Sequence, residues 1–267
     1  MADQLKTKWH CITSGDREKI PILFLHGFMG SCHIWEKTFA SLSEEFYAIA
    51  VDLPGHGKTE ADLKNLNFDS LANALIDFLT NISGRQWLIC GYSLGGRVAL
   101  YTALKYPDKF AGLVLESCHP GIEDENERIK RLQSDSQLAE KMRQQDILSF
   151  LRDWYRQPVF DYLSDDLKQK IIAKKSSGQP DRLASVLTAL SQGIQLPLWD
   201  RMSGWDIPAL ILAGEKDSKY AAIANRMAGL MTQSELVVVP SAGHIVHLEN
   251  HNVFMSALNS FLSSYIL

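Results

Sequence analysis

Short apolar runs recur along the chain, and several of them are continuous rather than alternating between apolar and polar residues. Continuous apolar character is expected of strands that are buried on both faces of a parallel sheet. We therefore predict that these runs form a largely parallel sheet. The predicted strands are WHCIT, PILFLHG, FYAIAVDL, WLICGYS, GLVLESC, PALILAGEKD and SELVVVPSAGH.

Segments with the apolar spacing of helices lie between these runs. Alternation of strands and helices along a chain indicates a doubly wound α/β sheet, because each parallel crossover needs a connecting helix. The predicted helices span Ser31 to Leu42, Phe68 to Ile82, Leu94 to Lys105, Tyr220 to Met231 and Val253 to Tyr265.

One interval breaks this rhythm, from about His119 to Asp200, where no convincing strand occurs. Its sequence is charged and favours helices, and the strand pattern resumes at Ile207. We predict a helical cap at residues 119–200, inserted in a core formed by residues 1–118 and 201–267. Insertions at the carboxyl ends of such strands commonly cover the ligand crevice.

Composition limits the partners of the chain. The 267 residues are 46% hydrophobic and carry a formal net charge of −4, which suits a globular core and not a nucleic-acid or anionic-membrane partner. No secretory signal and no bilayer-spanning run are evident, so a cytoplasmic protein is expected. The four cysteines are widely spaced without a C-x-x-C pair, which predicts buried thiols rather than a metal knuckle or a redox pair.

The chemistry is concentrated at GYSLG, where Ser93 lies between glycines after an apolar strand and before good helix formers. This is the context in which G-x-S-x-G forms a nucleophile elbow. Glycines on either side allow the strand and helix to approach closely, so the serine can occupy a strained turn with its hydroxyl exposed. The start of the following helix favours negative charge beside that hydroxyl.

Partners for Ser93 follow in the chain order of α/β hydrolases, which is serine, acid, histidine. Asp217 follows the strand PALILAGEKD, and His244 follows the next strand. The loop FLHGFMG is expected to contribute the backbone amide of Phe28, which would join the amide of Leu94 in an oxyanion hole. These pieces together predict the α/β-hydrolase fold, with a mostly parallel sheet.

Other motifs have weaker interpretations. His26 and His56 lie in turns, where hydrogen bonds that hold the backbone are expected. His247 and His251 are spaced as two ligands on a helix could be, but HLENH does not match H-E-x-x-H, so no metal is predicted. The string PGHGKT lacks the first glycine of a phosphate-binding loop, since position 52 is aspartate. A non-catalytic receptor or scaffold with the same fold is a further alternative. It is disfavoured, because such a protein has no need to keep all three members of a catalytic triad.

A triad alone does not name a reaction, because Ser93 could attack a carbonyl or remove a proton from carbon. Tyr92 precedes the serine, Arg97 follows it by about one helical turn, and the cap is rich in Arg and Lys. Cations facing the pocket would select a substrate with several carboxylates. Solvation at the surface is the alternative for Arg97. A serine esterase, thioesterase or C–C bond hydrolase that works through an acyl-enzyme is the alternative for the reaction.

Several strings together resemble the 2-succinyl-6-hydroxy-2,4-cyclohexadiene-1-carboxylate synthase family of menaquinone and phylloquinone biosynthesis. They are LHGFMGS, DLPGHG, GYSLGGRVAL, DWYRQPVF, GEKDSKY and GHIVHLEN. A further string in the cap begins with HPGI and continues, at intervals, with ER, R, D and LA. The resemblance implies a lyase that needs no metal or organic cofactor. That lyase eliminates pyruvate from 2-succinyl-5-enolpyruvyl-6-hydroxy-3-cyclohexene-1-carboxylate.

The resemblance also implies roles for individual residues. Ser93, Asp217 and His244 match the triad of the family, and Phe28 and Leu94 match its oxyanion-hole positions. Its substrate-contacting positions correspond to Tyr92, Arg97, Arg131 and Trp154, and Lys219 is a further expected carboxylate partner.

The cap departs from the family where an arginine is expected, because the chain has Lys174 and Lys175 there, of which Lys175 is favoured. Packing is the alternative for Trp154 and a solvated face for Arg131, and Arg128 competes with Arg131. The oligomeric state is not predicted.

Overall fold

The structure is a computed structural model that describes residues 5–175 and 179–265, apart from the side chains of Lys174 and Lys175. Its centre is a seven-stranded sheet in the order β2-β4-β3-β6-β7-β8-β9. Strand β2 pairs antiparallel with β4, and the other neighbours are parallel. The strands are β2 (Cys11–Ser14), β3 (Ile20–Leu25), β4 (Phe46–Val51), β6 (Trp87–Tyr92), β7 (Phe110–Glu116), β8 (Ala209–Gly214) and β9 (Ser234–Val239).

The sheet confirms the predicted α/β-hydrolase class, and each predicted strand supplies one of its members. A small antiparallel pair, β1 (Thr7–Lys8) with β5 (Glu60–Ala61), was not predicted, since two-residue strands leave no periodic pattern to detect.

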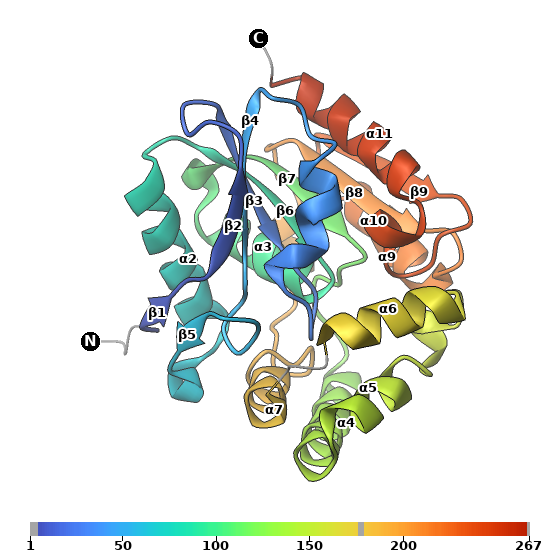
Figure 1. Cartoon of the computed structure of the whole chain (residues 1–267). Coiled ribbons are helices and arrows are strands. Elements are labelled where there is room, and N and C mark those ends of the chain that lie inside the picture. Colours follow the sequence, from blue (N-terminus) through green and yellow to red (C-terminus); the bar gives the residue numbers. More distant parts are fainter. Residues whose placement is uncertain (1–4, 176–178, 266–267) are drawn as a thin grey trace.

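Helices cover both faces of the sheet, and a further group lies below one end of it (Figure 1). They are α1 (Glu36–Phe39), α2 (Phe68–Ile82), α3 (Leu94–Lys105), α4 (Glu125–Gln144), α5 (Ile147–Trp154), α6 (Asp165–Lys175), α7 (Pro180–Ala189), α8 (Trp199–Met202), α9 (Ser218–Ala228), α10 (Val246–Glu249) and α11 (His251–Ser263). Short 3₁₀ turns are η1 (Cys32–Trp35), η2 (Leu63–Asn65), η3 (Pro107–Lys109) and η4 (Pro158–Phe160).

Strand residues alternate between two apolar cores, one on each face of the sheet. Leu23 of β3 packs in the core to which α2, α3 and α9 contribute, whereas Phe24 packs in the core that contains Trp35 and α11. Both side chains are fully buried. Burial on both faces explains why the strands read as continuous apolar runs.

Caps explain where the helices begin. Asn67 and Ser70 form a reciprocal capping box at the start of α2, which begins and ends where the sequence predicted. Asp217 caps α9, so this helix starts two residues before the predicted Tyr220. The helix predicted from Ser31 to Leu42 is wrong in extent, because a 3₁₀ turn precedes the four residues of α1.

Helices α4, α5, α6 and α7 lie in the chain between β7 and β8, with no strand among the described residues of this interval. Figure 1 shows them gathered below the end of the sheet where β6 leads into α3. Aspartate caps begin two of these helices, Asp124 at α4 and Asp146 at α5. We call α4–α7 the inserted helices.

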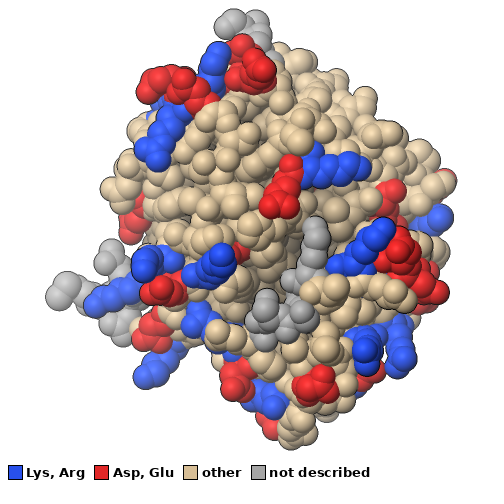
Figure 2. All heavy atoms as spheres, in the orientation of Figure 1, with Lys and Arg blue, Asp and Glu red and all other residues tan. Residues whose placement is uncertain are grey.

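The surface carries charges of both signs. On the face shown in Figure 2, lysine and arginine side chains are intermixed with aspartate and glutamate, and neither sign gathers into one large patch. Among the described residues, no helix has the length and apolar character needed to cross a membrane.

Candidate active site

Ser93 occupies a sharp turn between β6 and α3, with φ 52° and ψ −109°. A positive φ is unusual for a residue with a side chain and marks local strain. Two glycines make the turn possible. A Cβ on Gly91 would collide with the backbone of Gly95, and a Cβ on Gly95 would collide with the carbonyl oxygen of Leu25 in β3. The close approach of β6, α3 and β3 therefore requires glycine at both positions.

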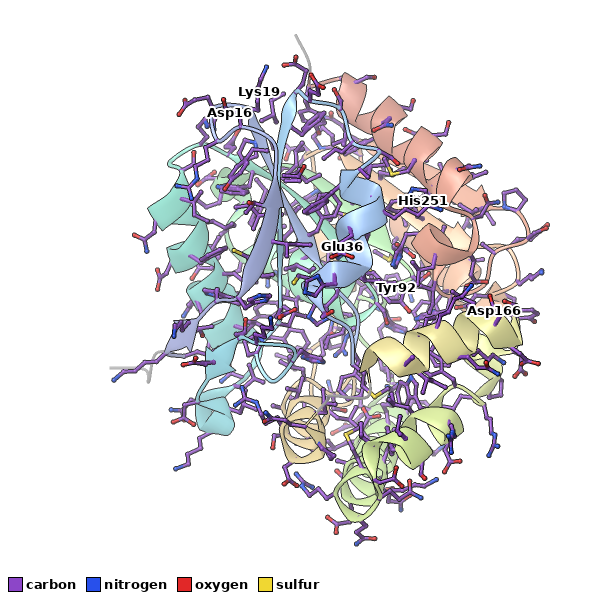
Figure 3. All side chains as sticks on the ribbon, in the orientation of Figure 1. Asp16, Lys19, Glu36, Tyr92, Asp166 and His251 are labelled. Carbon is purple, nitrogen blue, oxygen red and sulfur yellow. The ribbon has the colours of Figure 1, made fainter. Side chains whose placement is uncertain are left out.

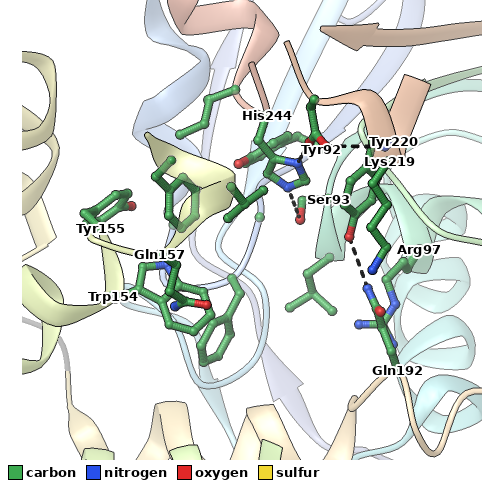
Figure 4. Close-up of a pocket in the computed structure, with 18 of the residues that line it drawn as sticks. Tyr92, Ser93, Arg97, Trp154, Tyr155, Gln157, Gln192, Lys219, Tyr220 and His244 are labelled. Atoms are coloured by element: carbon green, nitrogen blue, oxygen red, sulfur yellow. Dashed lines mark hydrogen bonds and ion pairs between the residues drawn. The ribbon is translucent and has the colours of Figure 1, made fainter. Parts of the chain in front are cut away.

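His244 joins the other two members of the predicted triad. Its Nδ1 lies 2.7 Å from Oδ2 of Asp217, and its Nε2 lies 3.2 Å from Oγ of Ser93 (Figure 4). An ionised carboxylate only accepts, so Nδ1 donates to Asp217 and leaves Nε2 to accept the serine proton. Asp217 and His244 are 9% and 6% exposed, which shields this pair from solvent. The arrangement can make the Ser93 oxygen basic or nucleophilic.

The loop that carries His244 is fixed by a carboxylate that the sequence analysis missed. Glu249 of α10 accepts the backbone amide of Gly243 through Oε2 and that of Ile245 through Oε1, both at 2.8 Å. These amides belong to the two neighbours of His244. The only available signal was the spacing of Glu249 from His244, which has no general meaning.

The loop with Phe28 lies directly beside Ser93. A Cβ on Gly27 would lie 3.4 Å from Cβ of Ser93, and both Phe28 and Leu94 line the same cavity as the serine. The backbone amide of Met29 donates to Nε2 of His56 at 3.0 Å. His26 likewise accepts the amide of Leu53 at 2.9 Å. The expected backbone-holding roles of His26 and His56 are confirmed.

A cavity of about 490 Å³ opens above Ser93 and extends toward the inserted helices. Tyr92, Arg97, Arg131, Trp154 and Lys219 all line it, so five of the predicted substrate contacts meet in one space. Figure 3 shows Tyr92 at the end of the sheet that faces α6. The side chain of the sixth, Lys175, lies outside the described residues.

Arg97 is buried in the wall of this cavity, with 6% of its surface exposed, which contradicts the alternative of a solvated surface residue. Its Nε donates to Oε1 of Gln195 at 2.6 Å and its Nη2 to the carbonyl of Leu190 at 2.8 Å. No carboxylate forms an ion pair with it within residues 5–175 and 179–265. Burial, assisted by the nearby charge of Arg131, lowers the pKa of Arg97 to about 10, so it stays cationic at neutral pH.

Arg131 is held by a carboxylate on its own helix, α4, and by an amide in the segment that follows α7. Its Nε donates to Asp135 Oδ1 at 2.8 Å and its Nη1 to Gln192 Oε1 at 2.9 Å. Asp135 is only 3% exposed and also accepts the hydroxyl of Ser191 at 2.7 Å. Arg131 lines the cavity, whereas the competing Arg128 is not among the described residues that line it.

Aromatic side chains form the opposite wall. The ring of Trp154 lies 5.6 Å from that of Phe28 and 6.2 Å from that of Phe150, so it both packs and faces the cavity. Burial raises the pKa of Tyr92 well above its usual value, which keeps the phenol protonated. Lys219 is exposed at the rim.

Two further cavity residues, Tyr220 and Gln192, were not predicted. The Tyr220 ring lies 4.6 Å from the His244 ring, and its hydroxyl accepts from Gln192 Nε2 at 3.4 Å. Tyr220 is three residues after Asp217, a helical spacing that could have indicated a shared face. Gln192 lies in the predicted cap, where the sequence did not indicate which side chains face the cavity.

His247 and His251 do not face a common ligand. Nδ1 of His247 pairs with Glu116 at 2.8 Å, whereas Nδ1 of His251 donates to the carbonyl of His247 at 3.2 Å. Elsewhere, ligand atoms of His10, Cys32 and Asp52 lie within 4.8 Å of one another. His10 donates to Oδ2 of this carboxylate at 2.8 Å, and the amide of Cys32 donates to Oδ1 at 2.7 Å. The hydrogen bonds of Asp52 thus account for this cluster.

Residues 20–251 match the family described as the alpha/beta hydrolase fold. The chain is 35% identical over 241 residues to a 2-succinyl-6-hydroxy-2,4-cyclohexadiene-1-carboxylate synthase of Escherichia coli, covering 90% of this chain and 93% of that protein. It is 34% identical over 254 residues to the synthase of Shigella dysenteriae, covering 95% and 98%.

Solved structures agree with these relatives. MenH from S. aureus superposes with a TM-score of 0.90 at 30% identity, covering 97% of this chain and 98% of that one. A thermophilic esterase from Thermogutta terrifontis has a TM-score of 0.82 at 22% identity, covering 97% and 94%, and shares the fold alone. The chain belongs to the 2-succinyl-6-hydroxy-2,4-cyclohexadiene-1-carboxylate synthase family of α/β hydrolases.

Proposed function

We propose that this protein eliminates pyruvate from 2-succinyl-5-enolpyruvyl-6-hydroxy-3-cyclohexene-1-carboxylate. The second product is 2-succinyl-6-hydroxy-2,4-cyclohexadiene-1-carboxylate, the compound after which its relatives are named. One observation carries this beyond the likeness to those relatives. Arg97 is a buried cation without a carboxylate partner among the described residues, and it lines the same cavity as Ser93. A buried charge is costly unless it is paired, so the site suits an anionic substrate that completes the pair.

Proton abstraction begins at the triad. Asp217 orients His244, whose Nε2 accepts the proton of Ser93 as the serine oxygen removes a proton from the substrate ring. The electron pair of that C–H bond, at C2, forms the C2=C3 double bond. The electron pair of the existing C3=C4 double bond shifts to C4=C5, and the C5–O bond to the enolpyruvyl group breaks. The departing enolpyruvate takes up a proton and becomes pyruvate. No bond forms between Ser93 and the substrate, so this route has no acyl-enzyme.

Negative charge that develops on the succinyl carbonyl oxygen during proton removal needs nearby donors. We assign this role to the backbone amides of Phe28 and Leu94, which belong to segments beside Ser93. Loss of one such donor typically costs about 3 kcal/mol of transition-state stabilisation. Hydrogen bonding of Met29 to His56 keeps the Phe28 loop in place.

The substrate carries a carboxylate on the succinyl arm, one on the ring and one on the pyruvyl group. Arg97 and Arg131 offer guanidinium groups that bind carboxylates through paired hydrogen bonds, and Lys219 offers a point charge at the rim. Trp154 and Phe28 supply an apolar wall for the ring. We also propose residues 119–200 as the cap of this site. Action in the cytoplasm stays a prediction.

The test measures pyruvate release by the purified protein from the succinylated enolpyruvyl substrate, with no added metal. We expect turnover by the wild type and none above background by Ser93→Ala, whose thermal unfolding should match that of the wild type. Turnover of p-nitrophenyl esters is the comparison for the acyl-enzyme alternative. Ester hydrolysis far faster than pyruvate release would contradict the lyase proposal.

A further inference from the structure

A chain of hydrogen bonds runs from the inserted helices to α9. Arg131 Nε donates to Asp135 at 2.8 Å, and Arg131 Nη1 donates to Gln192 Oε1 at 2.9 Å. Gln192 Nε2 then points to the Tyr220 oxygen at 3.4 Å. A guanidinium has only donors, so Arg131 fixes which end of the Gln192 amide faces it. The amide NH₂ group must therefore face Tyr220.

This polarity decides what the Tyr220 hydroxyl can do. Its oxygen accepts from Gln192, so its own hydrogen is directed elsewhere. No acceptor for that hydrogen is found in the part of the chain that the structure describes. Burial is the largest influence on the pKa of Tyr220 and raises it, although the nearby charges of Arg131 and Arg97 oppose the shift. The phenol consequently keeps its proton at neutral pH.

The hydroxyl faces the reaction cavity. Tyr220 lines it together with Ser93, Arg97 and Arg131, and its ring packs edge-on against His244 at 4.6 Å. Figure 4 shows the Tyr220 hydroxyl joined to Gln192 by a dashed line, and the charges of Arg131 and Arg97 lie close enough to act on this hydroxyl. A donor among cations, with no acceptor of its own among the described residues, suits an anionic oxygen.

We propose that Tyr220 donates a hydrogen bond to a carboxylate oxygen of the substrate and that Gln192 orients this donor. This inference rests on the proposed function, and it adds a neutral donor to the cationic groups expected from the sequence. The carboxylate would lie between the Tyr220 hydroxyl and the guanidinium groups. Tyr220 is then a specificity-determining residue for polycarboxylates.

Tyr220→Phe removes only the oxygen and tests the proposal. A hydrogen bond to a carboxylate stabilises the bound substrate more than one between neutral groups. Its loss should therefore raise KM for the succinylated substrate about tenfold and leave kcat within about twofold of the wild type. Tyr101→Phe is the matched control, because the Tyr101 hydroxyl also makes a hydrogen bond, to Asp69 at 2.6 Å, but Tyr101 is not among the described residues that line the cavity. It should leave both constants unchanged. An unchanged KM in Tyr220→Phe overturns the proposal, and so does a fall in kcat alone.

A binding measurement separates this inference from the proposed function. Calorimetric titration with succinate reports carboxylate binding whether or not the wild type releases pyruvate. We expect Kd for succinate to be about tenfold higher in Tyr220→Phe than in the wild type and in Tyr101→Phe. Equal affinities, or no binding of succinate by the wild type at millimolar concentration, would overturn it. Absence of pyruvate release alone would contradict only the proposed function.

Discussion

Glu249 holds the peptide groups on either side of His244, with both carboxylate oxygens in use. The amides of Gly243 and Ile245 each lie 2.8 Å from one oxygen. A Cβ on Gly243 would lie 3.1 Å from Oε2 of Glu249, so the clamp also favours glycine before the histidine. Because the clamp grips both neighbours, it sets the position of the imidazole relative to Ser93.

We predict that Glu249→Gln lowers kcat about tenfold and leaves KM within about twofold of the wild type. The glutamine amide has one acceptor oxygen, so one of the two backbone amides loses its partner and the imidazole shifts. Small displacements of a catalytic group are costly to rate. Pyruvate release measures both constants. Glu235→Gln, at an exposed position of β9, is the control. A rise in KM at constant kcat would contradict a positioning role.

We predict that replacing Arg97 changes the activity of the protein much more than its stability. Arg97→Met keeps the length of the side chain and removes a buried charge, while it leaves Gln195 and the carbonyl of Leu190 without that donor. These effects oppose each other, so the free energy of unfolding should change by no more than about 1 kcal/mol. KM should rise at least about tenfold, because a charged contact to substrate is lost.

Urea unfolding and pyruvate release measure the two effects of Arg97→Met. Arg201→Met is the matched control, since Arg201 donates to the carbonyl of Leu104 at 2.7 Å and is exposed. It should not affect KM. Equal losses of stability and activity in Arg97→Met would show that Arg97 serves the fold and not the substrate.

We predict that the carboxylate of Asp52 contributes to the stability of the fold in a pH-dependent way. Burial alone would raise its pKa, but hydrogen bonds from the backbone amides of Lys58 and Cys32 outweigh it and lower the pKa below the ordinary 3.8. The unfolded state then binds more protons in this range, so stability falls as the pH falls. The contribution is complete above about pH 3.8 and disappears as the pH drops through the lower folded value.

Asp52→Asn removes this carboxylate and should lower the free energy of unfolding by about 1–3 kcal/mol at pH 7. The difference from the wild type should shrink as the pH falls below about 4. Urea unfolding at several pH values measures it, with exposed Asp108→Asn as the control. A difference that stays constant down to pH 3 would show that the amide hydrogen bonds do not depend on the ionised form.

The strands and the triad could be predicted from the sequence, because at those positions the structure admits few residue types. Continuous apolar runs identified the strands, because a sheet buried on both faces tolerates little else. Ser93 was recognisable because glycine at 91 and 95 admits the close approach found there. Asp217 and His244 followed from chain order, since the carboxyl ends of parallel strands meet at one edge.

The remaining site residues depend on tertiary geometry that no local pattern encodes. Gln192 approaches Tyr220 only because the segment after α7 returns over α9, and its amide is turned by Arg131. Glu249 acts on backbone amides, which every residue has, so its partners leave no mark in the sequence. Arg131 could be chosen over Arg128 only after the orientation of α4 relative to the cavity was known.

The packing of the nucleophile turn gives a last prediction. A Cβ at position 95 would collide with the carbonyl oxygen of Leu25, and a backbone atom cannot rotate away. Gly95→Ala must therefore push α3 from β3, which moves Ser93 away from His244. We expect a loss of stability of about 1–3 kcal/mol from overpacking and at least a hundredfold fall in kcat. Gly84→Ala, with no atom within 4 Å of the added Cβ, should change neither quantity. Thermal unfolding and pyruvate release measure both variants, and full activity in Gly95→Ala would mean that the turn does not depend on this contact.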